Sequence, residues 1–120
     1  MGLNREQLLA QAKPKIIEVP VPEWGGTIHL RDITAGQRDQ YDGYQIDQQG
    51  QHKYTDFRAR LLILSICDQD GNRLFTDSEV STISSLPAHV VDRLWDQAAM
   101  LCGLKPEEME KNSEKDQSGG

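Results

Sequence analysis

The chain has 120 residues, the length of one domain, which is enough to bury one modest core. Its 13 basic and 19 acidic side chains give a formal net charge of -6. A surface with this balance repels a phosphate backbone, so nucleic acid is a poor partner. No apolar run approaches the roughly 20 residues of a membrane span. We therefore expect a soluble, cytoplasmic protein that binds neither nucleic acid nor a membrane.

The first part of the chain predicts a helix and then a β-hairpin. Asn4 and Gln7 have capping-box spacing, so a helix of two turns should follow and end at Lys13-Pro14. Two alternating stretches come next, "KIIEVPV" and "TIHLRDI", with Gly25-Gly26 as a tight reversal between them. Pro20 and Pro22 lack an N–H group, so the first strand should lie at a sheet edge or leave the sheet there.

A polar helix is predicted after the hairpin. Thr34 and Gln37 form a second capping box, so the helix should begin at Ala35 and run to about residue 47. Tyr41 and Tyr44 lie three residues apart on one face of this helix, and most of its other side chains are polar. The following "QQGQHKY" reads as a loop.

The centre of the core is predicted near the middle of the chain. From residue 55 or 56 a helix has Phe57, Leu61 and Leu64 at i, i+4 and i+7, and its second half is apolar on all sides. The run "LLILSIC" taken alone could equally be a buried strand. We expect Cys67 here, and Cys102 further on, to be buried, reduced thiols on helices.

Two more helices are predicted in the last third of the chain. Thr76 and Glu79 form a third capping box, which opens a short helix through about Ser84. Pro87 suits the first turn of the longest helix, which should end at Gly103. The apolar face of that helix consists of Val91, Leu94, Trp95, Ala98, Leu101 and Cys102. We assign Trp95 to the core.

The chain should end in a disordered acidic tail, because "KNSEKDQSGG" contains no apolar residue. The expected fold is therefore α+β: a small, helix-dominated domain with an N-terminal β-hairpin over residues 1–111, followed by a disordered tail over residues 112–120.

No pattern in the sequence indicates an enzyme, a metal site or a cofactor. "DQDGN" resembles a calcium loop, but its first ligand position falls on Ile66 and its twelfth on Asp77 instead of glutamate, so a simple turn is favoured. The three histidines lack metal-ligand spacing. Ser84-Ser85 has no GxSxG context, and Asp68 with Asp70 has no apolar pocket to separate their pKa values.

Exposed aromatic side chains instead suggest a protein partner. Trp24 at the hairpin tip, with Tyr41 and Tyr44 on the polar helix, could anchor an interface, because such residues bury a large area and keep a polar group. The alternative is that they merely cover a small core.

The order of motifs resembles the tail assembly chaperones of long-tailed, lambda-like bacteriophages and prophages. The similar segments are "VPVPEWGGTIHLRDITAGQRDQYD", "RARLLILSICDQDGNRLFTDSEV", "DRLWDQAAMLCGL" and the acidic "EEMEKN" ending, which together run from about Ile16 to Asn112.

This resemblance implies a non-enzymatic, non-virion factor of the host cytoplasm. Such a factor would coat the long helical tape measure protein and help tail tube subunits to assemble around it. A helical protein with exposed apolar stripes aggregates unless something covers them. Many weakly bound copies could do so through avidity, and head-to-tail self-contact would give an open spiral array.

The resemblance also implies a longer product made by ribosomal frameshifting, whose extra domain would recruit the tail tube protein. Glu110-Lys111-Asn112 can be encoded GAA AAA AAC, which contains the slippery heptamer A AAA AAC, whereas Glu114-Lys115-Asp116 cannot supply one. The tripeptide is also common enough in polar tails to occur by chance.

Two other classes of function remain open on the sequence alone. A small acidic interaction module, such as an antitoxin or adaptor, would share this composition. A hydrolase of unrecognised type would need a pocket with convergent titratable groups.

Overall fold

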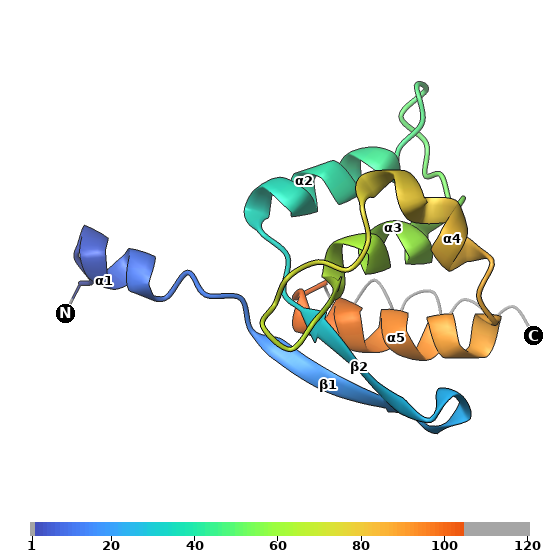
Figure 1. Cartoon of the computed structure of the whole chain (residues 1–120). Helices are drawn as coiled ribbons and strands as arrows, with labels where there is room; N and C mark the ends of the chain where they lie inside the picture. The colour runs from blue at the N-terminus through green and yellow to red at the C-terminus, as the bar shows by residue number, and fades with distance from the viewer. Residues whose placement is uncertain (1, 105–120) are drawn as a thin grey trace, which may run out of the picture.

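The computed structural model describes residues 2–104 of the chain, so the predicted tail over residues 112–120 lies outside the described residues. Helices and strands combine in an α+β domain, as the sequence predicted (Figure 1). In chain order the elements are α1 (Arg5–Ala10), β1 (Ile16–Val21), η1 (Pro22–Trp24), β2 (Gly26–Arg31), α2 (Ala35–Tyr44), α3 (Phe57–Ser65), β3 (Ile66–Cys67), η2 (Asp77–Glu79), α4 (Val80–Ser84) and α5 (Ala88–Leu101).

The predicted hairpin is the main part of a three-stranded antiparallel sheet of order β1-β2-β3. Val19 of β1 pairs with Ile28 of β2, and β1 lies at the edge of the sheet. Pro20 has no N–H group, which an edge strand tolerates because it pairs on one side only. Ile17, Val19 and Val21 face the core, as their alternation predicted. Within β2, only His29 and Leu30 pair with β3, so the first half of β2 has no strand beside it on that side.

The core lies where α3 meets α4, α5 and the sheet. All side chains from Leu61 to Cys67 are buried, and this one segment is helix through Ser65 and strand thereafter. The two readings of "LLILSIC" were each right for part of it. The prediction that Cys67 lies on a helix was wrong: the backbone turns extended at Ile66, with φ -66° and ψ 126°, because residues 66 and 67 complete the sheet.

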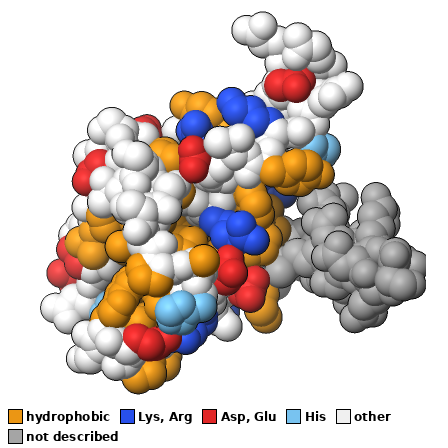
Figure 2. All heavy atoms as spheres, turned by 90° about the vertical axis from the view of Figure 1, so that its right-hand side faces the viewer, with side chains coloured by type: hydrophobic (Ala, Val, Ile, Leu, Met, Phe, Trp, Pro, Cys, Tyr) orange, Lys and Arg blue, Asp and Glu red, His pale blue; other side chains and the backbone are white. Residues whose placement is uncertain are grey.

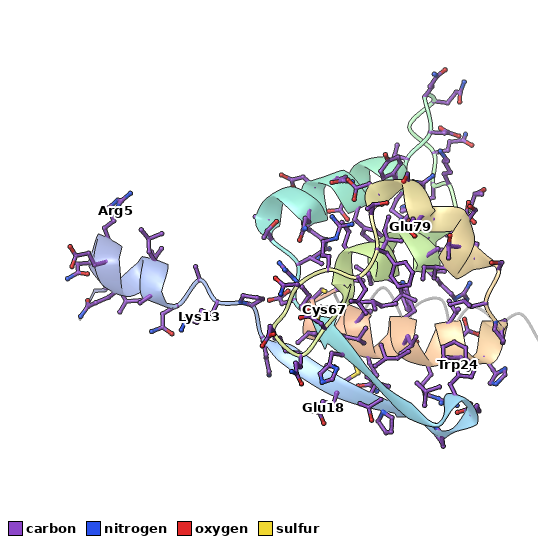
Figure 3. All side chains as sticks on the ribbon, in the orientation of Figure 1. Arg5, Lys13, Glu18, Trp24, Cys67 and Glu79 are labelled. Atoms are coloured by element: carbon purple, nitrogen blue, oxygen red, sulfur yellow. The ribbon has the colours of Figure 1, made fainter. Side chains whose placement is uncertain are left out.

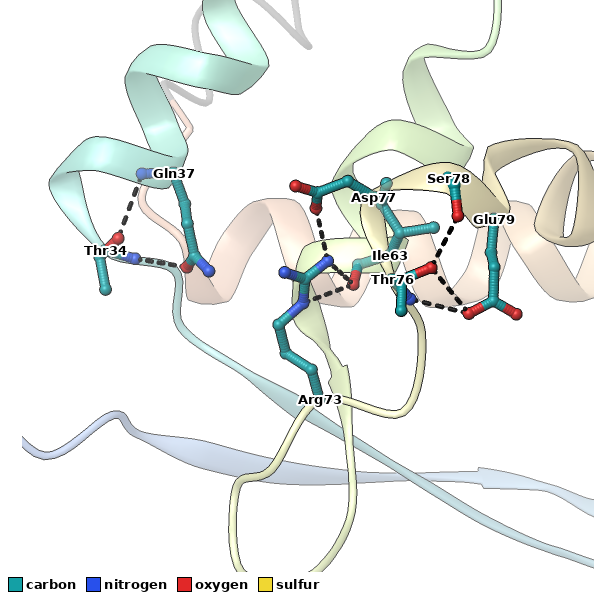
Figure 4. A network of polar contacts seen from close by, with 8 residues as sticks. All are labelled: Thr34, Gln37, Ile63, Arg73, Thr76, Asp77, Ser78 and Glu79. Carbon is teal, nitrogen blue, oxygen red and sulfur yellow. Dashed lines mark hydrogen bonds and ion pairs between the residues drawn. The ribbon is translucent and has the colours of Figure 1, made fainter.

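Capping hydrogen bonds begin three of the helical segments at the predicted residues. Asn4 with Gln7 and Thr34 with Gln37 form complete capping boxes. At the third site the Glu79 carboxylate accepts the Thr76 N–H at 2.8 Å (Figure 4). The Glu79 N–H in turn donates to the Thr76 carbonyl.

Helix α2 is shorter than predicted. It ends at Tyr44 instead of residue 47, because Asp47 starts a turn in which its carboxylate accepts the N–H groups of Gln49 and Gln51 at 2.9 Å. An isolated bridge between Ile46 and His52 closes this turn.

Helix α5 ends at the predicted glycine. Gly103 has φ +70°, its N–H bonds the Met100 carbonyl, and the Leu104 N–H bonds the Ala99 carbonyl. These are the two bonds of a Schellman motif, and Leu104 packs into the core behind it. Pro87 stands at the N-cap, one residue before the first turn.

An ion pair ties the hairpin tip to α5. Both guanidinium nitrogens Nη1 and Nη2 of Arg93 donate to the Glu23 carboxylate, at 2.8 and 2.6 Å, and His89 Nε2 lies 3.5 Å from the same group. Hydrogen bonding to Arg93 is the main reason why the pKa of Glu23 falls from 4.5 to about 2. The pair positions Trp24, the next residue.

We expect Ile83→Ala to lower the free energy of unfolding by about 2 to 5 kcal/mol, because its side chain is fully buried between α4 and the core. The matched control is Ile46→Ala, whose side chain is half-exposed and should cost less than about 1 kcal/mol. Urea unfolding measures both; equal costs would contradict the packing described.

We expect Glu23→Gln to lower the melting temperature at pH 6 by a few degrees at most, because the pair is exposed to solvent. A carboxyl group with a depressed pKa stabilises the fold above its unfolded pKa. That contribution is lost as the pH falls from about 4.5 through about 2, so the two proteins should converge in this window. Thermal melts from pH 6 to 2 measure the effect. Asp39→Asn, which removes an exposed carboxylate outside the ion pairs of residues 2–104, should show no such convergence.

Candidate partner-binding surfaces

The three aromatic residues predicted to anchor a partner lie in three different environments. Tyr41 is 5% exposed and belongs to the core, so its predicted place outside the core was wrong. Burial raises the pKa of its phenol. The nearby indole N–H of Trp95 acts in the opposite direction on that pKa, while Trp95 Nε1 itself has no hydrogen-bond partner among the described residues. Tyr41 can support a surface but cannot touch a partner in this conformation.

Trp95, which was assigned to the core, lies at its margin. It is half-buried and packs against the core, and its ring meets Phe57 edge to face with centroids 5.5 Å apart. The ring therefore contributes to packing while part of it remains in contact with solvent.

Trp24 is 45% exposed at the hairpin tip, at the opposite end of the hairpin from α1 (Figure 3). It borders an apolar groove with a volume of about 530 Å³. The groove exists because β3 is short: beyond His29 no strand covers the first half of β2, and the loop before α4 forms the other wall. Its apolar lining includes Trp24, Ile28, Leu74, Phe75, Leu86 and Leu94, and Asp68 and Asp70 also border it.

Tyr44 belongs to a second surface, which we call the loop patch: Tyr44, Ile46, His52 and Tyr54. Tyr44 is 42% exposed, and the Arg60 guanidinium lies 3.9 Å from the centre of its ring. Ile46 faces His52 across the bridge, and the His52 ring stacks on Tyr54 at 5.8 Å. The loop that carries most of this patch projects from the body beside the end of α2 (Figure 1).

A third exposed apolar surface lies on α1, which buries none of its residues. Leu3, Leu8 and Leu9 are all more than half exposed. The sequence predicted the helix, but it did not predict that the helix stands apart from the body. The missed signal is the linker "QAKPK", whose apolar side chains are only Ala12 and Pro14, too few to hold the helix against the body.

Figure 2 views the molecule from the side opposite α1 and shows hydrophobic side chains in several areas of this face, between charged groups. Nine large apolar side chains are exposed among the described residues. Three lie on the α1 segment, three on the loop patch and two at the groove: Leu3, Leu8, Leu9, Tyr44, Ile46, Tyr54, Trp24 and Leu74, with Met100 apart from them. Their clustering suggests contact with other proteins.

The aspartates and serines considered as calcium ligands, acid–base groups or nucleophiles make hydrogen bonds that stabilise local structure. The Asp68 carboxylate accepts the N–H groups of Asp70 and Asn72, at 2.8 and 3.0 Å, so "DQDGN" forms the predicted turn. Hydrogen bonds, chiefly with Asn72, lower the pKa of Asp68. Ser84 donates to Asp56 and Ser85 to the Thr82 carbonyl.

The two cysteines are unpaired thiols. Cys67 is buried and Cys102 half-buried. Burial raises the pKa of Cys67, and it raises that of Cys102 to about 11, so both are protonated at neutral pH. Within residues 2–104, no three His, Cys, Asp or Glu side chains are grouped closely enough to hold a metal ion. None of the helices described has the length and apolarity needed to cross a bilayer.

Comparison with known proteins identifies the family. The family model described as phage tail assembly chaperone matches residues 7–115. Among solved structures, the bacteriophage HK97 tail assembly chaperone is similar, with a TM-score of 0.62 and 25% sequence identity over 80% of this chain and 95% of that one. No curated protein matches significantly.

The family match spans the hairpin, the groove and the loop patch, and the HK97 structure has a similar fold. The resemblance seen in the sequence is thus confirmed. The chain belongs to the phage tail assembly chaperone family, whose members are non-enzymatic chaperones.

Proposed function

We propose that this protein coats the tape measure protein in the host cytoplasm and helps tail tube subunits to assemble around it, without remaining in the virion. Family membership supports a role in tail assembly. The observation that carries the finer proposal is the separation of exposed apolar side chains into distinct surfaces, the groove with Trp24 and the loop patch with Tyr44. A coat needs at least two such surfaces, one for the client and one for the next copy.

We assign the client to the loop patch. Its Tyr and Ile side chains can cover an apolar stripe of a long helix, and Arg60 beside Tyr44 can contact acidic side chains at the edge of that stripe. The patch is small, so each copy binds weakly. Tight coating then requires many copies, whose avidity comes from their contacts with one another.

We assign contact between copies to the groove at Trp24. An apolar groove on one copy must receive a different surface of the next copy, and such a heterologous contact gives an open array if its rotation does not close. A spiral array can follow a tape measure of any length. The acidic charge of the chain keeps free copies soluble and apart.

The rival role as an antitoxin or adaptor has no observation in its favour now that the family is established. A hydrolytic role would need convergent titratable groups in a pocket. In the groove, the Asp68 carboxylate is engaged by the backbone of its own turn, and burial keeps the Cys67 thiol protonated, so neither favours this role.

We expect Tyr44→Ala with Tyr54→Ala to reduce the amount of soluble tape measure protein on coexpression, while self-association persists. Trp24→Ala should instead weaken self-association, because Trp24 borders the groove assigned to contact between copies. Circular dichroism should show folded proteins in both cases, because these side chains are exposed. Met100→Ala is the matched control, because Met100 is exposed and lies apart from both the loop patch and the groove. A folded Tyr44/Tyr54 variant that solubilises the tape measure normally would contradict the assignment.

We also propose a minor longer product, made by a backward slip of one nucleotide at the codons for residues 110–112, which lie outside the described residues. Its added domain would recruit the tail tube protein to an array built of the short form. Expression of the intact locus should give two bands, and synonymous recoding that interrupts A AAA AAC should remove the larger one. Two bands after recoding would place the slip elsewhere, and a single band from the intact locus would refute the two-product idea.

A further inference from the structure

Helix α1 is folded but has no partner within the described part of its own chain. The capping box at Asn4 fixes its start, and its side chains are all exposed. Figure 1 shows it standing clear of the body at the end of an extended linker. A helix of six residues is only marginally stable in water unless one face is packed. The segment therefore has the form of a docking element whose receptor lies on another molecule.

The apolar side chains of α1 are arranged for a single contact. Leu3 precedes the N-cap Asn4, and Leu8 is the fourth residue of the helix, the spacing at which two apolar residues meet as a hydrophobic staple. Leu9 extends this surface. Together they provide a compact apolar face that remains in solvent in the isolated chain.

The groove at Trp24 has the matching properties. Trp24 and Leu74 at its margin are 45% and 56% exposed, so they too lack a partner. The charges are also complementary. Residues 2–15 carry three basic and one acidic side chains, a net charge of +2, whereas residues 16–104 carry seven basic and thirteen acidic ones, a net charge of -6. Two of those acids, Asp68 and Asp70, border the groove.

The geometry separates α1 from the Trp24 end of the chain's own groove, whereas the other end of that groove, at Asp68 and Asp70, lies near the linker. Pro14 and Ile16 lie against Gly71, which fixes where the linker leaves the body. Arg5 and Trp24 lie at opposite ends of the molecule (Figure 3). The six residues of β1 put the Trp24 end roughly 20 Å from Ile16, and the five linker residues 11–15 span at most about 18 Å. To contact its own Trp24, the helix would have to fold back along its own sheet, and docking on a second copy has no such requirement.

We propose that α1 of one copy docks in the groove of the next copy, with Leu8 and Leu9 against Leu74 and Trp24, so that copies join head to tail. Helix α1, which we call the arm, lies at one end of the hairpin, and the groove extends to the other end. A copy whose arm is docked therefore still has its own groove free for the arm of another copy. The contact is small, which makes it reversible. This inference rests on the self-association part of the proposed function and not on tape measure binding.

Two variants and their mixture test this arrangement. Leu8→Ser with Leu9→Ser removes the arm contact and leaves the groove intact; Leu74→Lys removes the groove contact and leaves the arm intact. The matched control is Ile46→Ser with Tyr54→Ser on the loop patch. Sedimentation velocity over a range of concentrations measures assembly, and circular dichroism checks that each variant is folded.

We expect the wild-type chain and the control to assemble progressively with concentration. Each arm or groove variant should associate roughly tenfold or more weakly, since burying one leucine supplies at least that much affinity. An equal mixture of the two defective variants should form a one-to-one dimer and nothing larger, because one arm and one groove remain usable between them.

Three results would overturn the inference. Normal assembly of the Leu8/Leu9 variant would show that copies join through another surface, while the proposed coat would stand. A monomeric mixture of the two variants would show that α1 does not enter the groove at Leu74. A wild-type chain that stays monomeric at every concentration would remove both this contact and the proposed array, even if Tyr44 still contributed to tape measure binding.

Discussion

Burial of the segment from Leu61 to Cys67 on every side is the constraint on which the rest of the structure depends. Its helical half must be enclosed, and α4 and α5 enclose it. Its extended half must satisfy backbone hydrogen bonds, and β2 supplies them at His29 and Leu30. One apolar run therefore fixes the position of the last two helices and anchors the hairpin.

The same constraint produces the groove. Only two residues of this segment are available as a strand, because the preceding residues are needed in the helix. A strand of that length leaves the first half of β2 uncovered, and the loop at Leu74 does not close the space. Arg73 holds the loop in place: its Nε and Nη2 atoms donate to the Ile63 carbonyl, and Nη2 also donates to Asp77 (Figure 4). The loop wall of the groove is thus held by hydrogen bonds to α3 and η2.

Much of this fold could be predicted locally. The capping boxes at Asn4 and Thr34, the alternation in β1 and the Schellman end of α5 each depend on residues close in sequence. Tyr41 shows where local reasoning fails. Helix α2 has few apolar residues to define its inner face, and it packs on α3. The Trp95 indole, which lies close enough to affect the pKa of Tyr41, comes from α5, some fifty residues later. The groove could not be foreseen either, because it depends on where one buried run changes from helix to strand.

The exposure of apolar side chains was also harder to predict than the positions of the helices and strands. Leu8 and Leu9 in α1 look like any short apolar face, and nothing in the helix itself shows that the polar linker separates it from the body. The loop patch depends on a turn at Asp47 that ends α2 early and brings Ile46 opposite His52. These surfaces follow from connections between elements, which periodicity does not describe.

The prolines of β1 have a consequence for the physical state of a concentrated chaperone. β1 is an edge strand, and a free edge normally invites pairing with the edge of another molecule, the first step toward fibrous aggregates. Pro20 removes one donor from that edge, and Pro22 ends the strand in a tight 3₁₀ turn. At high concentration the protein is thus protected from irreversible sheet extension.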